Sequence, residues 1–322
     1  MAAEPSSSKI AVVAALIGNL LVAITKAIAA ALTGSSSMLS EAVHSLVDTV
    51  NEVLLLYGMR RAAQRADAYH PFGYGRELYF WSFVVALLIF ALGAGVSIFE
   101  GIGHVRQPEP VTDPYINYIV LVLALLFEGG SWLVSLRQFR AAKGDLAWFE
   151  AFRRSKDPPS FMVLFEDSAA LVGIAIAAGA TALSLRLDAP WIDGIGSILI
   201  GLVLGAVAII LARESKALLI GERAADELTD SLRKATLHQS GVKGVESILT
   251  TQLSPDQVIA TLSVHFDDSL DVPKLEQLIG RIEAELRHQH PELFRVFVRP
   301  TPSTSDSILS YRDQPQRVAR NG

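Results

Sequence analysis

The sequence predicts an α-helical membrane domain of six transmembrane helices, followed by a small α+β domain. Two observations lead to this fold class. Over the first two-thirds of the chain, apolar residues gather in blocks about as long as the roughly 20 residues that a bilayer-spanning helix needs. After residue 213 the composition becomes that of an ordinary soluble protein. The whole chain is 51% hydrophobic and 19% charged, whereas a soluble domain carries about 25% charged residues.

Six segments are long and apolar enough to cross a bilayer: 10–32, 38–59, 78–100, 115–137, 159–184 and 191–212. The first segment resembles a secretory signal only superficially. It is longer than the apolar region of a signal peptide, lacks a clear cleavage site and is followed by five further segments. We therefore expect it to remain in the protein as the first span.

Basic residues alternate between the predicted loops. They are concentrated in the second and fourth loops: Arg60, Arg61, Arg65, Arg76, and then Arg140, Lys143, Arg153, Arg154, Lys156. The first loop has none, and the third and fifth have one each, Arg106 and Arg186. The positive-inside rule then assigns both termini to the cytoplasm. We expect a multi-pass protein of the cell (inner) membrane.

The region after the spans predicts the element order αββαβ, which suits a two-layer α+β domain. The expected elements are a helix at 224–238, strands at 245–253 and 257–267, a helix from Asp271 to His290, and a strand at 293–298. The polar chain end is expected to be disordered. The predicted organisation is a cytoplasmic segment 1–9, a six-span domain 10–212, a cytoplasmic domain 213–300 and a tail 301–322.

The second span contains ionisable residues, each of which costs about 2.5–3.5 kcal/mol to insert into a bilayer. Glu41, His44, Asp48 and Glu52 recur at helical spacing and share one face. His44 and Asp48 lie one turn apart, so both can reach a single ion. Imidazole favours zinc and neighbouring transition metals over magnesium or calcium. The chain has no cysteine, so thiolate ligands are excluded.

Acidic residues also occur in two other spans, Glu128 in the fourth and Glu166 with Asp167 in the fifth. At about 1.5 Å rise per residue, Asp48, Glu128 and Asp167 lie about 12–17 Å from the cytoplasmic ends of their spans. They can therefore share one layer. Adjacent helical residues point about 100° apart, so only one member of the fifth-span pair can face the ion, and we favour Asp167. Basic partners are scarce, Lys26 being the main one, so a structural ion-pair network is the less favoured alternative.

Glu41 and Glu52 lie nearer the ends of the second span. Two interpretations remain open for them: exposure to water, or a place in the site or on a proton path.

Several motifs together resemble the cation diffusion facilitator family of metal/proton antiporters. They are Lys26, the stretches 34–38 and 41–48, the run His70-Pro71-Phe72-Gly73-Tyr74-Gly75-Arg76, and Asp193-Gly194. The stretches 155–158 and 166–170 resemble the branch that contains zinc transporter nine. The resemblance implies six spans, a ferredoxin-like cytoplasmic domain and a homodimer.

The family's ion site is tetrahedral, with two ligands from the second span and two from the fifth. His44 and Asp48 match the first pair, and Asp167 matches one member of the second. Val163 departs from the pattern, because the family usually has His or Asp there. We expect Glu128 to supply the fourth ligand, with Glu166 or water as the alternative.

Two secondary metal sites of some relatives look incomplete. Asp67 and His70 match a loop site, but Tyr74 stands where a further His is expected, so a loop fixed by ordinary hydrogen bonds is the favoured reading. The histidines of the second domain are expected to lie at its surface: His238, His265, His288 and His290.

The resemblance and the residues together imply export of a divalent metal, most of all zinc, in exchange for protons by alternating access. The metal and protons are then transported substrates, and no permanent cofactor is expected. Manganese, cobalt or iron as substrate, a carrier of organic cations, and a membrane metal sensor without flux remain alternatives. No HExxH or serine-nucleophile pattern indicates an enzyme, and a net charge of −5 argues against nucleic-acid binding.

Overall fold

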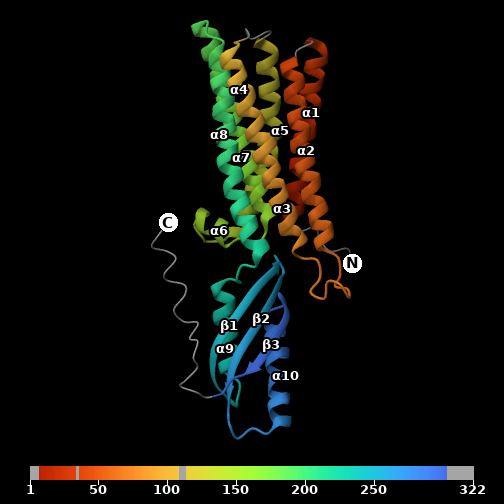
Figure 1. Cartoon of the computed structure of the whole chain (residues 1–322), viewed down its shortest axis with the longest axis vertical. Helices are drawn as coiled ribbons and strands as arrows, with labels where there is room; N and C mark the ends of the chain where they lie inside the picture. The colour runs from red at the N-terminus through yellow and green to blue at the C-terminus, as the bar shows by residue number, and fades with distance from the viewer. Residues whose placement is uncertain (1–6, 34–35, 109–113, 303–322) are drawn as a thin grey trace. The chain divides into compact units, whose positions relative to one another are not determined.

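The computed structural model of the chain describes residues 7–33, 36–108 and 114–302, without some side chains near the start of the second helix. The chain divides into two compact units. The first is a bundle of long helices, and the second is built mainly from a sheet with two helices (Figure 1). Most of the predicted tail, from residue 303 on, and most of the N-terminal segment lie outside the described residues.

Six long helical stretches coincide with the six predicted segments. They are α1 (Ser7–Thr33), α2 (Ser36–Ala62), the stretch formed by α3 (Glu77–Leu88), η1 (Ile89–Gly95) and α4 (Val96–Arg106), α5 (Pro114–Lys143), α7 (Pro158–Leu187) and α8 (Trp191–Ile220). Among the described residues, five of these are long and apolar enough to cross a membrane. The exception is α2, which has 27 residues but carries the polar stripe.

The third helical stretch is not the uninterrupted α-helix expected from the sequence. Its middle, η1, is π-helical over seven residues and contains Gly93 and Gly95. Such turns form i→i+5 hydrogen bonds and are rare outside functional sites and single bulges. The apolar pattern alone could not reveal it, because a π-turn leaves composition unchanged.

A short helix between α5 and α7 was also not predicted. This helix, α6 (Trp148–Arg154), buries Ala151 and Phe152 against the bundle. The Phe152 ring lies 5.0 Å from that of Phe161 and 4.8 Å from that of Phe165. Aromatic pairs at such distances are favourable packing contacts, so the connection is folded onto the helices it joins.

Close glycine contacts bring α4 and α8 together. A Cβ added to Gly101 would lie 2.7 Å from the carbonyl oxygen of Gly194 and 2.8 Å from the backbone nitrogen of Ile198. Gly194 is equally tight, with the carbonyl oxygen of Gly101 at 2.8 Å. Small residues let helix backbones approach closely in lipid, and here two of them do so at one crossing.

The second unit has the predicted order αββαβ. Its elements are α9 (Asp226–Leu237), β1 (Val242–Ser254), β2 (Gln257–Phe266), α10 (Val272–Gln289) and β3 (Leu293–Pro300). The strands lie in the order β1-β2-β3, with β2 and β3 parallel. Leu232, Leu262 and Ile282, from α9, β2 and α10, are fully buried in one apolar cluster. At the expected start of the second helix, Asp271 caps α10 by accepting a hydrogen bond from the Lys274 backbone at 3.0 Å.

The α4–α8 crossing predicts a large effect for a single methyl group. Gly101→Ala places that group against backbone atoms of α8, and overpacking of this kind costs about 1–3 kcal/mol. We expect a lower thermal midpoint for the variant purified in detergent. Gly103→Ala is the matched control, because an added Cβ there meets nothing within 4 Å. Equal midpoints for the two variants would contradict the close contact.

Candidate metal site

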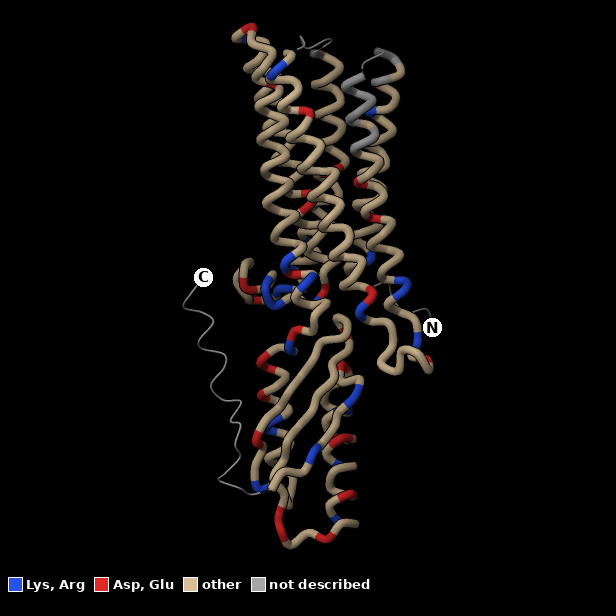
Figure 2. Tube along the Cα trace, viewed as in Figure 1, with Lys and Arg blue, Asp and Glu red and all other residues tan. Residues whose placement is uncertain are grey.

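The polar stripe of α2 faces the interior of the bundle. Asn51 is 1% exposed and Glu52 is completely buried, while Asp48 is half-buried. The side chains of Glu41 and His44 lie outside the described part of the structure, although their backbone belongs to α2. Water exposure, one of the two readings for Glu52, is therefore wrong. Figure 2 shows acidic positions within the apolar helices.

The two acids of α7 point in different directions, as their adjacent positions require. Asn51 on α2 donates its side-chain N–H to Glu166 at 3.4 Å. Ser131 on α5 donates its hydroxyl to Asp167 at 2.8 Å. Both acids are buried. Glu166 therefore faces α2, and Asp167 faces α5.

The acidic side chains of α2, α5 and α7 lie near one another. Asp48 is a charged neighbour of Glu52, Glu128 and Glu166. Asp167 is a charged neighbour of Glu52, Glu128 and Glu166. The carboxyl groups that the sequence assigned to one layer are therefore close enough to interact.

The interface between α5 and α7 is held by polar side chains. Besides the Ser131–Asp167 bond, the indole N–H of Trp132 donates to the Ser168 hydroxyl at 2.9 Å. Ser168 in turn donates to the backbone oxygen of Leu164. These bonds fix the rotation of α7 relative to α5 and hence the directions of its two acids.

Several buried oxygens in this region have no hydrogen-bond partner among the described residues. They belong to α2, α5 and α7: Asn51 Oδ1, Glu52 Oε1 and Oε2, Glu128 Oε2, Ser135 Oγ, Gln138 Oε1 and Glu166 Oε2. Buried polar groups are almost always paired, and unpaired ones cost free energy. Oxygen atoms held in this way are suited to receive a cation, a proton or water. In the described part of the chain, no three His, Asp or Glu side chains converge closely enough to hold a metal ion.

Val163 supplies no ligand. Its side chain is fully buried in the apolar cluster that also contains Leu55, Phe161 and Leu211. One turn further along α7, the same helix presents Glu166 and Asp167. Position 163 therefore belongs to the hydrophobic core, which agrees with the departure from the family pattern noted in the sequence.

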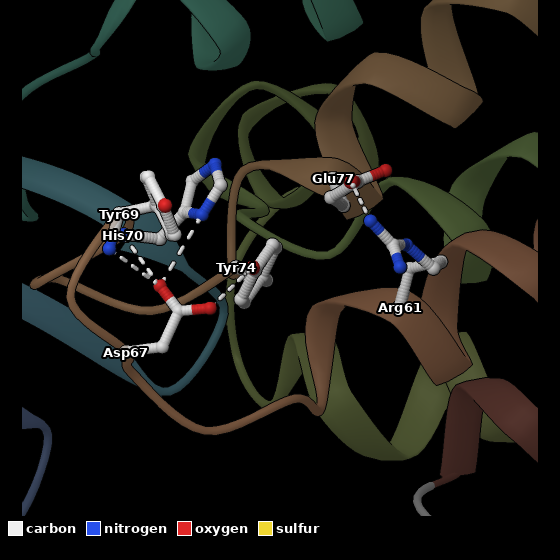
Figure 3. A network of polar contacts seen from close by, with 6 residues as sticks. All are labelled: Arg61, Asp67, Tyr69, His70, Tyr74 and Glu77. Atoms are coloured by element: carbon white, nitrogen blue, oxygen red, sulfur yellow. Dashed lines mark hydrogen bonds and ion pairs between the residues drawn. The ribbon is translucent and has the colours of Figure 1, made fainter.

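The loop after α2 is organised around Asp67 (Figure 3). One carboxylate oxygen accepts hydrogen bonds from the backbone N–H groups of Tyr69 at 2.9 Å and His70 at 2.6 Å. The other accepts the Tyr74 hydroxyl at 2.7 Å. This last bond is the main cause that lowers the pKa of Asp67 below its usual value. The carboxylate is thus engaged by the loop itself, which favours the structural interpretation over a metal site.

A second contact network ties the same loop to α3. Arg61 pairs with Glu77 at 3.0 Å, and Trp81 donates to the other oxygen of Glu77 at 2.8 Å. The Arg61 guanidinium also lies 5.4 Å from the centre of the Tyr74 ring. The end of α2 and the start of α3 are therefore held together by these contacts.

Histidines of the second unit contact their own domain. His238 contacts the carbonyl oxygen of Lys234 at 2.7 Å, one turn back on α9. His290 lies 2.9 Å from the Ser231 hydroxyl and 3.4 Å from Glu292. These contacts give the side chains of both histidines a partner within the second unit that is not a metal ion.

Four polar residues of the site were not singled out from the sequence: Asn51, Ser131, Ser135 and Gln138. A signal existed for them, since Asn51 lies three residues after Asp48, and Ser131 and Ser135 lie three and seven residues after Glu128. Helical spacing places such residues on the face of the neighbouring acid.

Comparison with known proteins agrees with a helical membrane domain followed by a small α+β domain. Residues 12–220 match the profile of the cation efflux transmembrane domain, and residues 224–303 match that of the cation efflux protein, cytoplasmic domain. This chain therefore belongs to the cation efflux, or cation diffusion facilitator, family. The family consists of transporters and not of enzymes.

Within the family, the chain resembles the branch of zinc transporter nine. It is 32% identical over 238 residues to the human "Proton-coupled zinc antiporter SLC30A9, mitochondrial", covering 73% of this chain and 42% of that protein. It is 31% identical to "Metal tolerance protein C4" of Arabidopsis thaliana, covering 78% and 55%. It is 25% identical to "Cation-efflux pump FieF" of Serratia proteamaculans, covering 89% and 92%. The chain thus spans less than half the length of the SLC30A9 protein.

The hydrogen bonds of the loop allow a test between two roles for Asp67, a structural role in the loop and a role as metal ligand. Tyr74→Phe removes one donor to the carboxylate, so we expect faster tryptic cleavage after the exposed Arg65. Tyr69→Phe is the control, because Tyr69 contributes only its backbone N–H. Because the pKa of Asp67 is lowered, its contribution is present above the ordinary pKa and is lost as pH falls through the lowered value. The loop should therefore also open in acid, where cleavage by pepsin, an acid-active protease, replaces the tryptic measurement. Protection of the loop by zinc, abolished by His70→Ala, would instead support a metal site.

Proposed function

We propose that this protein is a secondary active transporter that exports a divalent metal cation, with zinc as its principal substrate, from the cytoplasm in exchange for protons. The observation that carries the proposal is the meeting of acids from α2 and α7 inside an apolar bundle, marked by the Asn51–Glu166 hydrogen bond. Membership of the cation efflux family and the resemblance to the proton-coupled zinc antiporter SLC30A9 support it.

The ion is proposed to bind between α2 and α7. His44 and Asp48 lie one turn apart on α2 and supply one imidazole and one carboxylate. The sequence alone favours Asp167 as the α7 ligand. The side-chain directions favour Glu166, because Glu166 faces α2 and has Asp48 as a charged neighbour. We therefore assign Glu166 as the α7 ligand and leave Asp167 on the α5 side.

The donor set argues for zinc. An imidazole combined with carboxylates suits zinc, manganese, cobalt or iron, whereas magnesium and calcium prefer all-oxygen sites. Zinc accepts tetrahedral coordination by nitrogen and oxygen ligands. His44, Asp48 and Glu166 provide three such ligands, and Glu128 or a water molecule is proposed to provide the fourth.

Proton exchange follows from the chemistry of the same groups. Metal binding requires deprotonated ligands and therefore releases protons. Histidine, with an ordinary pKa of about 6.5, exchanges metal for a proton near neutral pH. The buried carboxyl groups of Glu52 and Asp167 are proposed to hold protons while the site is empty of metal. Alternating access then exposes the loaded site to one side and the protonated site to the other.

We propose six spans in the membrane, namely the five apolar helical stretches and α2, with both termini in the cytoplasm. The basic second and fourth loops support this orientation. We further propose that the protein is a homodimer of the cell (inner) membrane. The match of residues 224–303 to a cytoplasmic domain supports the assignment of the second unit to the cytoplasm.

Asp48→Asn is expected to abolish zinc flux and the accompanying proton movement. The substitution removes the charge that would hold the ion while preserving side-chain size. The measurement uses vesicles that contain both a zinc-sensitive and a pH-sensitive dye, with manganese, cobalt and iron as competing substrates. Asp145→Asn, an exposed residue of the α5–α6 connection, is the matched control. Wild-type flux in Asp48→Asn would overturn the proposal, and zinc binding without any flux would indicate a sensor.

Glu166→Gln is expected to weaken zinc binding by at least about 10–100-fold. Loss of a residue that only orients a metal ligand already has an effect of this size. Asp167→Asn should have a smaller effect. Calorimetric titration of the purified protein measures both affinities. Asn51→Ala and Ser131→Ala remove the hydrogen bonds to Glu166 and Asp167 respectively, and the former should weaken binding more. The reverse order in both pairs would identify Asp167 as the ligand.

A further inference from the structure

The connection between α5 and α7 presents two aromatic side chains that the transport site does not use. Phe149 is 71% exposed and Trp148 is 49% exposed. Both lie at the start of α6, whose Ala151 and Phe152 are buried in the bundle. The helix is thus anchored through one face and leaves two large aromatic groups on another.

The lengths of the neighbouring helices fix the depth of this connection in the bilayer. α5 and α7 have 30 residues each, so each is about 45 Å long. A bilayer is about 30 Å thick in its hydrocarbon core and about 40–45 Å with its headgroup regions. The ends of the two helices, Lys143 and Pro158, therefore lie at the level of the lipid headgroups. The connection begins and ends there.

Aromatic contacts show that α6 folds back toward the hydrocarbon. The ring of Phe152 lies 4.8 Å from that of Phe165, which is seven residues, or about 10 Å, along α7 from Pro158. The ring of Trp148 stacks on Phe139 at 5.9 Å, one turn before the end of α5. These contacts hold α6 beside the last turn of α5 and the first turns of α7. They keep α6 from extending into the cytoplasm.

Positive charge surrounds the exposed aromatic groups. Figure 2 shows basic residues gathered around α6. The Lys143 ammonium lies 5.4 Å from the centre of the Trp148 ring. Arg140 is exposed and makes no ion pair with a described side chain, and Arg153 is also exposed. Tryptophan beside lysine and arginine is the composition of helices that lie in a membrane interface and attract anionic lipids.

We propose that α6 is an interfacial anchor for an anionic lipid leaflet. Phe149 and Trp148 lie at the boundary between headgroups and acyl chains, and Arg140 and Arg153 contact lipid phosphates. Because α6 connects α5 with α7, the anchor attaches the ends of two site-bearing helices to the membrane surface. The occupant of this face is lipid and not a second protein.

The absence of cysteine allows a direct test. Phe149→Cys, labelled with a small environment-sensitive fluorophore, is reconstituted into phosphatidylcholine vesicles that contain lipids with a nitroxide on the headgroup. We expect quenching several-fold stronger than for Ala284→Cys, an exposed position on α10 in the second unit. Equal quenching at the two positions would overturn the proposal. Oxidative cross-linking of unlabelled Phe149→Cys between two copies, together with shielding from lipid in the labelled sample, would assign this face to a dimer contact instead.

The proposed contacts of Arg140 and Arg153 with lipid phosphates are tested separately. Replacing half of the phosphatidylcholine by phosphatidylglycerol should increase the quenching at position 149. Adding Arg140→Gln with Arg153→Gln should abolish this increase and leave the quenching in neutral lipid unchanged. Arg281→Gln with Arg287→Gln, two exposed residues of the second unit, should preserve the increase. A response to phosphatidylglycerol that survives the first pair would contradict the assigned phosphate contacts.

Discussion

The constraint on which the bundle depends is the cost of carboxyl groups in an apolar environment. Asp48, Glu52, Glu166 and Asp167 lie on helices surrounded by hydrophobic residues, where an isolated charge is strongly unfavourable. Only the inside of a packed bundle can accommodate such groups. The hydrogen bonds from Asn51 to Glu166 and from Ser131 to Asp167 join α7 to α2 and to α5. The polar residues thus help to hold these helices together.

Two kinds of packing keep those groups in place. On α7, Val163 lies in the hydrophobic core, and the next turn carries both acids. Rotation of α7 would exchange these faces and place a carboxyl group in the apolar cluster. On the other side of the bundle, glycines bring α4 and α8 into backbone contact. The candidate site is therefore held by a shell of apolar and close-packed helices, while several buried oxygens of Glu52, Glu128 and Glu166 make no hydrogen bond to a described residue.

Most of the fold follows from the sequence because its signals are long and periodic. Apolar blocks predicted all six long helical stretches, and the start of α10 was expected at Asp271. The π-helical turn and α6 could not be predicted in this way. A π-turn changes hydrogen bonding without changing composition, and the seven residues of α6 are too few for a helical period to emerge from a charged loop.

For the candidate site, the sequence offers residue types, whereas the directions of the side chains depend on tertiary contacts. Helical spacing identified the face of α2, but the choice between Glu166 and Asp167 depends on the rotation of α7. That rotation is fixed by Ser131 and Trp132, which lie far from α7 in the sequence. Glu52 shows the same limit, since its position near a helix end suggested water exposure although neighbouring helices bury it completely.

The π-helical turn in the third stretch has a geometric consequence for the whole bundle. An additional residue in a turn shifts the angular phase of every following side chain by about 100°. Before the turn, α3 packs against both α2 and α8, and after it, α4 packs mainly against α8. The shift therefore changes which side of the segment meets α8 before and after the turn. A helical wheel drawn through 77–106 with a single period would assign the residues after Gly95 to the wrong side.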